Sequence, residues 1–347
     1  MLRVRALSVA PGQPSTAAVE ERSDPDPAEG SVLVEGLLVG MCGTDVEIAE
    51  DGFGIPPPGA ERIVLGHESL GRVLEAAGGF AVGDLVAGVV RRPDGCGACA
   101  ADQWDMCVGG EFLERGIRRA DGYGATRWRA DPRFLVRLDP ALDELGVLLE
   151  PTTVVAKAWE QVERIGSRAW WQPRTVLITG AGPIGLLAAL LGVQRGLDVH
   201  VVDLMADGPK PLLVDDLGAT YHSVPVAETG LRPDVVIECT GVSSVVWDCL
   251  NQLAPGAVVC LAGISAGRAE LDRTAAVAAR ELLLSNEVVF GTVNAGARHH
   301  GQAALALARA DPSWLRRLIT RRVPLADWPQ ALERRSGDVK VVVDLRA

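Results

Sequence analysis

Residues 175–185 read Thr-Val-Leu-Ile-Thr-Gly-Ala-Gly-Pro-Ile-Gly, and this stretch determines the architecture expected for the second half of the chain. Its first five residues predict a buried parallel strand, and the glycines turn the chain into an apolar helix expected at 186–196. The next expected strand, 199–202, ends at Asp203. A G-x-G-x-x-G pattern alone is weak evidence. Strand, glycines, helix, strand and acidic residue in this order, however, predict a Rossmann unit that binds a dinucleotide.

The residues of the glycine turn are the first cofactor-binding candidates. Gly180 permits the tight turn, Gly182 lets the backbone approach a pyrophosphate, and Gly185 lets the helix pack closely on the strand. Pro183 and Ile184 complete this part of the candidate site. The N-terminus of the helix is expected to supply backbone N–H donors to the phosphates.

Asp203 favours NAD as the cofactor. Its carboxylate should accept hydrogen bonds from the hydroxyls of the adenosine ribose, whereas the 2′-phosphate of NADP would meet a like charge. No arginine directly follows Asp203, and Lys210 is the nearby cation that would favour NADP instead. We therefore expect NAD, with NADP as the alternative.

Three further strands are expected to complete this sheet, at 234–239, 257–263 and 288–292. Thr240 follows the first of them and Asn294 follows the last, and both are cofactor-binding candidates. Single cysteines in such apolar surroundings are expected to be buried structural thiols rather than reactive groups. They are Cys239, Cys249 and Cys260.

Length and composition limit the classes of protein. A chain of 347 residues exceeds one core, so two domains are expected, and 48% hydrophobic with 23% charged residues indicates a well-packed globule. The net charge of −11 argues against a nucleic acid or an anionic membrane as partner. No apolar run approaches the roughly 18 residues of a membrane helix, and no signal peptide is evident. We therefore expect a cytoplasmic protein.

The periodicity of the first 150 residues differs from that of the second half. Short apolar strands with glycine punctuation predict an antiparallel, barrel-like β unit, so the fold class is α/β plus β. A helix at 152–165 should lead into the dinucleotide unit. The expected strands of the β unit lie at 31–41, 63–65, 71–75, 80–90 and 134–138.

Four residues of this β unit have the side chains of a catalytic zinc site, and they are scattered as such ligands usually are. His67 and Glu68 are adjacent, and neighbouring side chains in an extended segment point to opposite faces. One of them should therefore point at the metal, while the other reaches it obliquely or forms a hydrogen bond to one of the ligands. A lone histidine flanked by glycines would more simply be a turn residue. The neighbouring thiol and two carboxylates favour zinc. The candidates are Cys42, His67, Glu68 and Glu150.

A second group of cysteines, Cys96, Cys99 and Cys107, forms what we call the cysteine lobe (residues 96–107). The spacing indicates thiolates for a metal before it indicates disulfides. A closed tetrahedral zinc site needs four ligands, and three cysteines are present. The fourth could be a carboxylate, or the lobe could be a metal-free loop. The carboxylate candidates are Asp94, Asp102, Asp105 and Glu111.

Together these motifs resemble the zinc-dependent medium-chain dehydrogenase/reductase superfamily over essentially the whole chain. The resemblance rests on Cys42-Gly43-Thr44-Asp45, Gly66-His67-Glu68, the Gly83-Asp84 turn, the cysteine lobe and the glycine turn. Within the superfamily the chain looks most like the glucose 1-dehydrogenase branch. The stretches that suggest this branch are 110–117, 121–123, 146–151, 291–294 with His299, and 337–340.

The resemblance implies a GroES-like catalytic domain over 1–155, to which 295–347 return, and a Rossmann NAD-binding domain over 156–294. It implies that Cys42 and His67 bind catalytic zinc, with Glu68 and Glu150 as direct, exchanging or water-mediated ligands. It also implies that Thr44 contacts the reacting hydroxyl. The residues then expected near a sugar are Glu114, Glu150, Asn294 and His299. The lobe departs from the family's four-cysteine form, because Pro93 stands about where the first cysteine would fall.

The expected activity is oxidation of the anomeric hydroxyl of an aldopyranose such as glucose to its lactone, with zinc as Lewis acid and NAD as hydride acceptor. The catalytic candidates are Cys42, Thr44, His67 and Glu68. The alternatives are a dehydrogenase of a secondary alcohol, a polyol or an aminosugar, and a non-catalytic dinucleotide sensor. A homo-oligomer, dimer or tetramer, is expected because the dinucleotide unit has an apolar strand edge.

Overall fold

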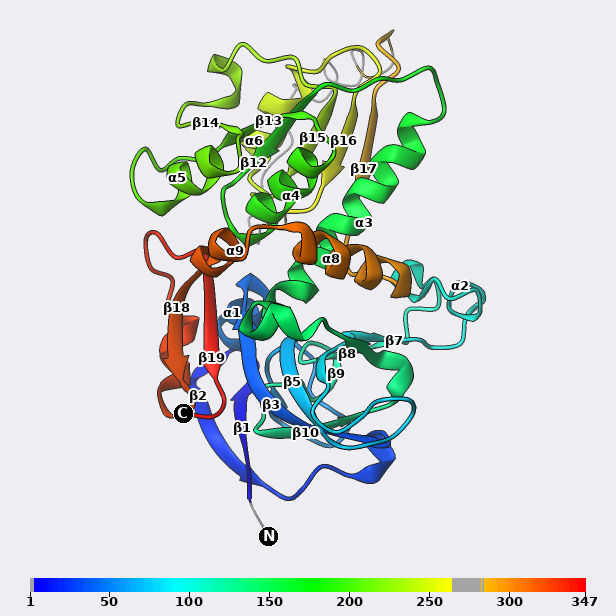
Figure 1. Ribbon diagram of the computed structural model, residues 1–347, viewed down its shortest axis with the longest axis vertical. Helices are drawn as coiled ribbons and strands as arrows, with labels where there is room; N and C mark the ends of the chain where they lie inside the picture. Colours follow the sequence, from blue (N-terminus) through cyan, green and yellow to red (C-terminus); the bar gives the residue numbers. More distant parts are fainter. Residues whose placement is uncertain (1–2, 264–281, 283) are drawn as a thin grey trace. The chain divides into compact units, whose positions relative to one another are not determined.

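The computed structural model describes residues 3–263, 282 and 284–347, and the chain divides into two compact units (Figure 1). The first unit comprises Met1–Glu150 and Asn294–Ala347, and the second comprises Pro151–Val293. The C-terminal segment therefore lies in the same unit as the N-terminal segment. No described helix is both long and apolar enough to cross a membrane.

The first unit is built on a mostly antiparallel sheet whose strand order is β11-β6-β5-β3-β19-β18, with β10 also paired to β3. The central strand β3 is buried along most of its length, as its run of apolar residues predicts. Within this sheet, as far as the structure describes it, β18 and β19 form the one parallel pair. The bounds are β3 Val32–Met41, β5 Glu68–Glu75, β6 Leu85–Gly88, β10 Arg127–Ala130, β11 Leu135–Arg137, β18 Ile319–Pro324 and β19 Lys340–Asp344.

The last strand of the chain pairs with the strand that leads to Cys42. In this antiparallel pairing Val341 lies opposite Met41, and Val343 lies opposite Val39. Behind these strands a core cluster includes the fully buried Trp328. The register places the N-terminal end of β19 beside the end of β3, where the metal candidates begin.

Two smaller sheets of this unit were missed or misjudged from the sequence. The strands β1 (Val4–Ala10) and β2 (Gln13–Arg22) form a hairpin that continues to β4 (Ile63–Val64). The strands expected from the sequence include none within 111–123, whereas β8 (Leu113–Arg115) and β9 (Arg119–Ala120) lie there, and β8 pairs with both β9 and β7 (Arg91–Arg92). These strands are two or three residues long, too short to show alternation.

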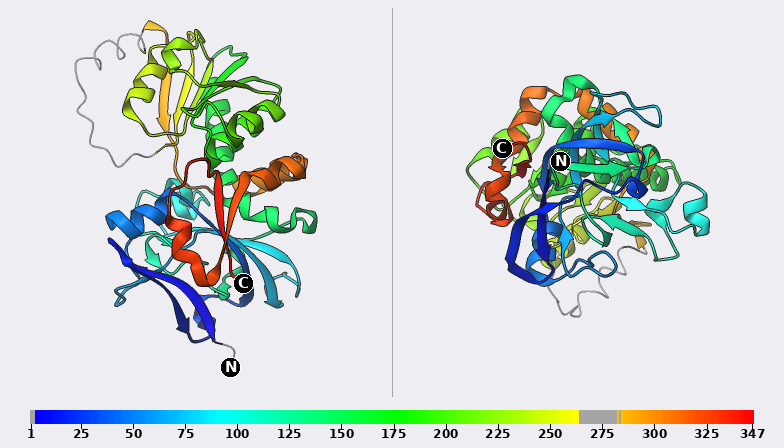
Figure 2. Two further views of the ribbon diagram at one scale, coloured as in Figure 1. Left: turned by 90° about the vertical axis from the view of Figure 1, so that its left-hand side faces the viewer. Right: turned by 90° about the horizontal axis from the view of Figure 1, so that it is seen from below.

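The second unit carries a parallel sheet with the described strand order β14-β13-β12-β15-β16-β17. This is the doubly wound order, and the direction of winding reverses between β12 and β15. Helices lie on either side of the sheet (Figure 2). The strands are β12 Thr175–Thr179, β13 Asp198–Val202, β14 Thr220–His222, β15 Val235–Glu238, β16 Val258–Leu261 and β17 Val288–Gly291.

The helices begin earlier than their apolar residues suggest. In α4 (Pro183–Gln194) the helix starts at the proline, three residues before the expected position, and α3 (Leu149–Gly166) starts three residues before residue 152. In both helices a proline occupies the first turn, where its missing N–H has no intrahelical partner to lose. The other described α-helices are α1 Gly43–Asp51, α2 Gly97–Ala100, α5 Pro209–Asp216, α6 Ser243–Leu250, α8 Ala297–Arg309 and α9 Pro312–Leu318.

Candidate active site and dinucleotide site

Cys42 is fixed at the junction of β3 and α1. It is the N-cap of α1, and its Sγ accepts a hydrogen bond from the backbone N–H of Thr44 at 3.3 Å. The side chain of Asp45 closes the capping box by accepting from the backbone N–H of Cys42 at 3.0 Å. Cys42 is therefore held by two cap bonds, one at its thiol and one at its backbone N–H, of the kind that fix helix N-termini.

His67 lies with one ring nitrogen toward Cys42 and the other toward Asp45. Its Nε2 is 3.1 Å from Cys42 Sγ, and its Nδ1 is 3.6 Å from Asp45 Oδ1. Burial lowers the pKa of His67, but the charges of Cys42 and Asp45 more than offset this effect, so that its pKa lies well above the usual value. Asp45 is completely buried and was not among the predicted site residues, although its position three residues after Cys42 was a usable signal.

Gly66 explains how the chain reaches His67. Its φ is +89°, a left-handed conformation that glycine adopts without strain. A Cβ at this position would also lie 2.4 Å from a methyl carbon of Val39. The glycine before the histidine is thus required by the backbone.

Glu68 and Glu150 form a second group with His67. One ligand atom from each of the three residues falls within 4.8 Å of the others. The Glu68 carboxylate accepts from Lys340 Nζ at 2.6 and 2.7 Å, and both side chains are almost fully buried. Burial raises the pKa of Glu150 to about 7, an effect that Glu68 strengthens and His67 opposes. The thiol of Cys42 and the two carboxylates thus belong to two groups that share the imidazole of His67, and these are donor types suited to zinc.

The sugar-binding candidates Glu114 and Asn294 are in direct contact. Asn294 Nδ2 donates to Glu114 Oε1 at 2.8 Å. The same oxygen accepts from Arg91 Nε at 3.0 Å and from Arg91 Nη2 at 2.9 Å. Arg91 was missed in the sequence, because β7 was not predicted. His299 is fully buried in the first turn of α8, where its Nδ1 accepts from the backbone N–H of Gly296 at 2.9 Å.

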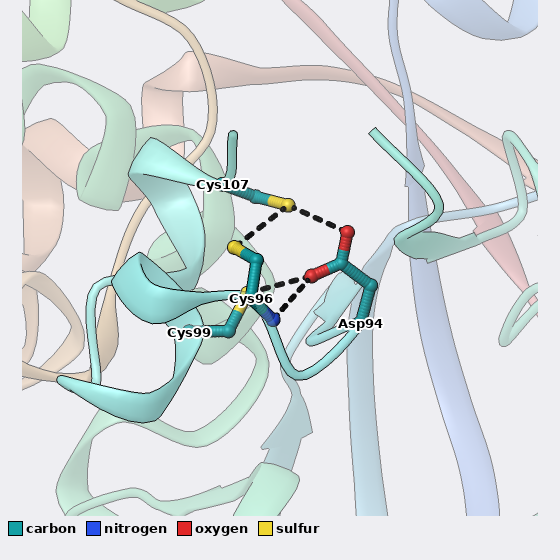
Figure 3. A group of neighbouring side chains, drawn as sticks. All are labelled: Asp94, Cys96, Cys99 and Cys107. Atoms are coloured by element: carbon teal, nitrogen blue, oxygen red, sulfur yellow. Dashed lines mark hydrogen bonds between the residues drawn. The ribbon is translucent and has the colours of Figure 1, made fainter. Parts of the chain in front are cut away.

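The three cysteines of the cysteine lobe converge with Asp94 (Figure 3). Cys107 Sγ lies 3.7 Å from Cys96 Sγ and 3.1 Å from Asp94 Oδ2, and Cys99 Sγ lies 3.4 Å from Asp94 Oδ1. Backbone hydrogen bonds, the strongest of them at Cys99, lower the pKa of Cys96 to about 7. Three sulfurs and one carboxylate therefore form a set that could hold a metal ion.

The other carboxylates considered for the lobe are placed elsewhere. Glu111 forms an ion pair with Arg119. Asp105 is buried beside Gly296: a Cβ added to this glycine would lie 2.5 Å from Asp105 Oδ1. Among the described residues, the group that gathers at these thiols includes Asp94 and neither of these two acids.

The glycine turn of the second unit has the stereochemistry expected for it. Gly180 has φ +83°, and a Cβ on Gly185 would lie 1.8 Å from the carbonyl oxygen of Gly180. A Cβ on Gly182 would meet nothing within 4 Å, so the space in front of this residue is open. Gly182 is the N-cap of α4, whose first backbone N–H groups are available for an anion.

Asp203 is bound to the glycine turn and to Lys210. Its Oδ2 accepts from the backbone N–H of Ala181 at 2.7 Å and from Lys210 Nζ at 3.0 Å. The acid at the end of β13 therefore supports the turn at the end of β12. Lys210, the cation considered in the sequence, is in direct contact with it.

Thr240 is held at the point where the winding of the sheet reverses. The buried Glu238, the last residue of β15, accepts from the backbone N–H of Thr240 at 2.7 Å and of Gly241 at 3.0 Å. It also accepts from Thr179 Oγ1 at 3.0 Å, which links the ends of β12 and β15. Glu238 was not predicted as a site residue. The signal that could have identified it is an acidic residue at the end of a strand, directly before Cys239 and Thr240.

An alcohol dehydrogenase GroES-like domain matches residues 28–140. Together with the parallel-sheet unit and the two candidate ligand groups that share His67, this match defines the class of zinc-dependent medium-chain dehydrogenases. The glucose dehydrogenase C-terminus family matches residues 143–345, more than half of the chain. The chain therefore belongs to the glucose dehydrogenase family within this class, and the fold class and resemblance predicted from the sequence are confirmed.

Similar proteins span the whole chain. The glucose 1-dehydrogenase of Thermoproteus tenax is 37% identical over 351 residues, covering 99% of this chain and 100% of that protein. Glucose 1-dehydrogenase 2 of Vulcanisaeta moutnovskia is 35% identical over 350 residues, covering 99% of both. The solved structure of Haloferax mediterranei glucose dehydrogenase in complex with NADP, Zn and gluconolactone has a TM-score of 0.90 at 30% identity, covering 98% of this chain and 99% of that one.

Proposed function

We propose that the protein oxidises the anomeric hydroxyl of an aldopyranose such as glucose to the lactone, with a nicotinamide dinucleotide as hydride acceptor. The observation that carries this proposal is the Glu114 carboxylate. Three donors converge on its Oε1, whereas Oε2 receives no hydrogen bond from any residue that the structure describes. A carboxylate oxygen of this kind, on a side chain that is 12% exposed, suits a polyhydroxylated substrate, because an alkanol would leave it without a partner. The names of the relatives agree with this substrate class.

The residues proposed to hold the catalytic zinc are Cys42 and His67, with Glu68 and Glu150 as direct, exchanging or water-mediated ligands. When bound, zinc supplies Lewis acidity that favours the alkoxide form of the substrate hydroxyl. Asp45, opposite Nδ1 of His67, orients the ring so that Nε2 faces the metal position. Lys340 compensates the charge of Glu68, and Thr44 is the residue proposed to orient the hydroxyl and pass on its proton.

We infer NAD as the preferred cofactor, with NADP as the alternative. The glycine turn and Thr240 would bind the dinucleotide in the second unit, and Asp203 would accept from the adenosine ribose hydroxyls. The contact between Lys210 and Asp203 supports NAD, because the lysine charge is already compensated. Asn294, also considered for the cofactor, donates its amide to Glu114 and is proposed for the substrate.

We also infer a second zinc ion in the cysteine lobe, bound by Cys96, Cys99, Cys107 and Asp94. A mixed set of three thiolates and one carboxylate can close a tetrahedral site. Gly109 supports the position of the carboxylate, since a Cβ there would lie 2.2 Å from Asp94 Oδ2. The proposed role of this ion is structural.

The test of the reaction is an initial-rate screen on zinc-replete protein with NAD and NADP. Glucose, galactose, xylose, secondary alcohols and polyols are the substrates. Saturable reduction of NAD with an aldopyranose is expected. Activity restricted to alcohols or polyols would contradict the sugar assignment while leaving the dehydrogenase class intact, and silence on every substrate would favour a sensing role.

We further propose that the protein forms a homo-oligomer, dimer or tetramer. Strand β17 stands at one end of the described sheet order in the second unit, and its Val288, Val289 and Phe290 are only half-buried. An edge of this kind can add the matching strand of a second copy. Light scattering coupled to size-exclusion chromatography measures the oligomer, and a monomeric mass would contradict this proposal.

A further inference from the structure

Arg91 is a buried cation whose donors point in two directions. It lies on β7 directly opposite Glu114 on β8, and 6% of its surface is exposed. Nε and Nη2 donate to Glu114 Oε1, as described above. Nη1 points away from the carboxylate, toward the backbone carbonyl oxygens of Trp104 at 3.4 Å and Asp105 at 3.3 Å.

Those two carbonyls belong to the cysteine lobe, between Cys99 and Cys107. The guanidinium group therefore connects the backbone of the lobe to one oxygen of Glu114. It is also fixed in its plane, because Arg91 Cζ lies 3.9 Å from the centre of the Phe112 ring. Such stacking leaves the guanidinium little freedom to swing away from the carboxylate.

We propose that Arg91 is a positioning residue for the substrate, which holds Glu114 against the cysteine lobe so that Oε2 remains directed to a sugar hydroxyl. The inference rests on the proposed function, because it assigns Glu114 to substrate binding. Arg91 itself does not touch the substrate in this account. Its contribution is to occupy Oε1 and so to decide which carboxylate oxygen the sugar meets.

The charge and the shape of Arg91 both matter for this task. The Glu114 side chain is 12% exposed, so a carboxylate without its cation would turn toward water or take up a proton. A lysine would restore the charge, but its single ammonium group cannot reach the carboxylate and the two lobe carbonyls in the same fixed geometry. Arg91→Lys is therefore expected to act as an intermediate variant.

The experiment is a double-mutant cycle of Arg91→Met and Glu114→Gln on the full-length, zinc-replete protein. Each single variant is expected to raise KM for the preferred aldopyranose about tenfold, with kcat within about twofold, because one charged hydrogen bond to the substrate is lost. The double variant is expected to match the single variants, since both changes remove the same interaction. Deoxy analogues that lack the hydroxyl bound by Oε2 should show no further loss in Arg91→Met.

Arg115→Met is the matched control. Arg115 follows Glu114 on β8, is similarly buried, and pairs with Glu29 at 3.0 Å instead. Its replacement should leave KM unchanged. An equal rise of KM in this control, effects that multiply in the double variant, or a fall of kcat at constant KM in Arg91→Met would overturn the inference.

The outcomes separate this inference from the proposed function. Unchanged KM in Glu114→Gln, or no turnover of any aldopyranose by the unmodified protein, would overturn both. A raised KM in Glu114→Gln together with a normal KM in Arg91→Met would overturn the inference alone. If Arg91→Met does not fold, Arg91→Lys decides: a severalfold higher KM supports the positioning role, and an unchanged KM contradicts it.

Discussion

Lys340 reaches Glu68 across 272 positions of the chain, and its Nζ lies 2.6 and 2.7 Å from the two carboxylate oxygens. The same ammonium group donates to the carbonyl oxygen of Met41, the residue before Cys42, at 3.3 Å. One buried cation thus contacts both strands that bring the metal candidates together. It compensates a carboxylate that would otherwise be buried without a counter-charge.

Replacing this lysine should be strongly destabilising. Lys340→Met leaves the Glu68 carboxylate buried without its cation, so the free energy of unfolding of the metal-free protein should fall by about 3–5 kcal/mol. Urea unfolding measures the loss. The double variant Glu68→Gln/Lys340→Met should recover much of it, and a single variant within about 1 kcal/mol of the unmodified protein would contradict the importance of the pair.

Cys42→Ala should separate turnover from cofactor binding. The metal candidates and the glycine turn belong to different units, so we expect turnover to fall at least about a thousandfold while the Kd for NADH changes little. NADH fluorescence titration and initial rates are the measurements. Cys249→Ala removes a buried thiol of the second unit and should retain activity. Near-normal turnover of Cys42→Ala would refute the catalytic zinc assignment.

Asp94→Ala should remove one metal ion without removing the other. Elemental analysis is expected to fall from about two zinc ions per chain to about one, because the lobe loses its fourth ligand. Asp94→Cys should retain both ions. Asp102→Ala should also retain both ions, because Asp102 is a carboxylate of the lobe that lies outside the cluster. An unchanged zinc content in Asp94→Ala would exclude this aspartate as a ligand.

Gly182 and Gly185 should differ in what an added methyl group disturbs. Gly185→Ala places Cβ 1.8 Å from the Gly180 carbonyl oxygen, so the turn must deform at a cost of about 1–3 kcal/mol in unfolding free energy. Gly182→Ala meets nothing within 4 Å and should leave the Tm unchanged while weakening NAD binding. Calorimetry and cofactor titration distinguish the two. Unimpaired NAD binding by Gly182→Ala would argue against a pyrophosphate at this residue.

Asp203→Ala should shift cofactor preference toward NADP. Removing the carboxylate frees Lys210 and abolishes repulsion of the 2′-phosphate, so the ratio of kcat/KM for NADP to that for NAD should rise about tenfold or more. NAD binding should also weaken, because Ala181 loses its acceptor. Asp207→Ala, an exposed acid in the same loop, is the control. A constant ratio would exclude a role of Asp203 in cofactor choice.

The second unit was the more predictable half because its signals are local. Gly180, Gly182, Gly185 and Asp203 lie within one strand-helix-strand segment, and short-range stereochemistry explains each of them. The structure gives the turn a left-handed Gly180 and a close approach at Gly185, and the dinucleotide site itself stays a prediction. The start of α4 was displaced, since a proline in the first helical turn is not apolar enough to mark it. The edge strand β14, three residues long, was not predicted.

The first unit depends on contacts between distant residues, and there the sequence was less informative. Cys42, His67, Glu68 and Glu150 were predicted as zinc ligands because their side chains suit zinc, and Asp94 was one of several acids near the thiols. Lys340 and Arg91 carried no such signal. Their partners become visible only once β19 lies beside β3 and β7 lies beside β8, and pairings of this kind are set by the tertiary fold.

The pairing of β19 with β3 also orders events during synthesis. The ribosome releases Cys42, His67 and Glu68 long before Lys340, with the whole second unit translated in between. Until β19 is added, the sheet edge beside Met41 is open and the Glu68 carboxylate lacks its counter-charge. A nascent chain halted before residue 340 would therefore hold the Glu68 carboxylate beside His67 without its counter-charge. Completion of this candidate metal site is thus tied to the late docking of one five-residue strand.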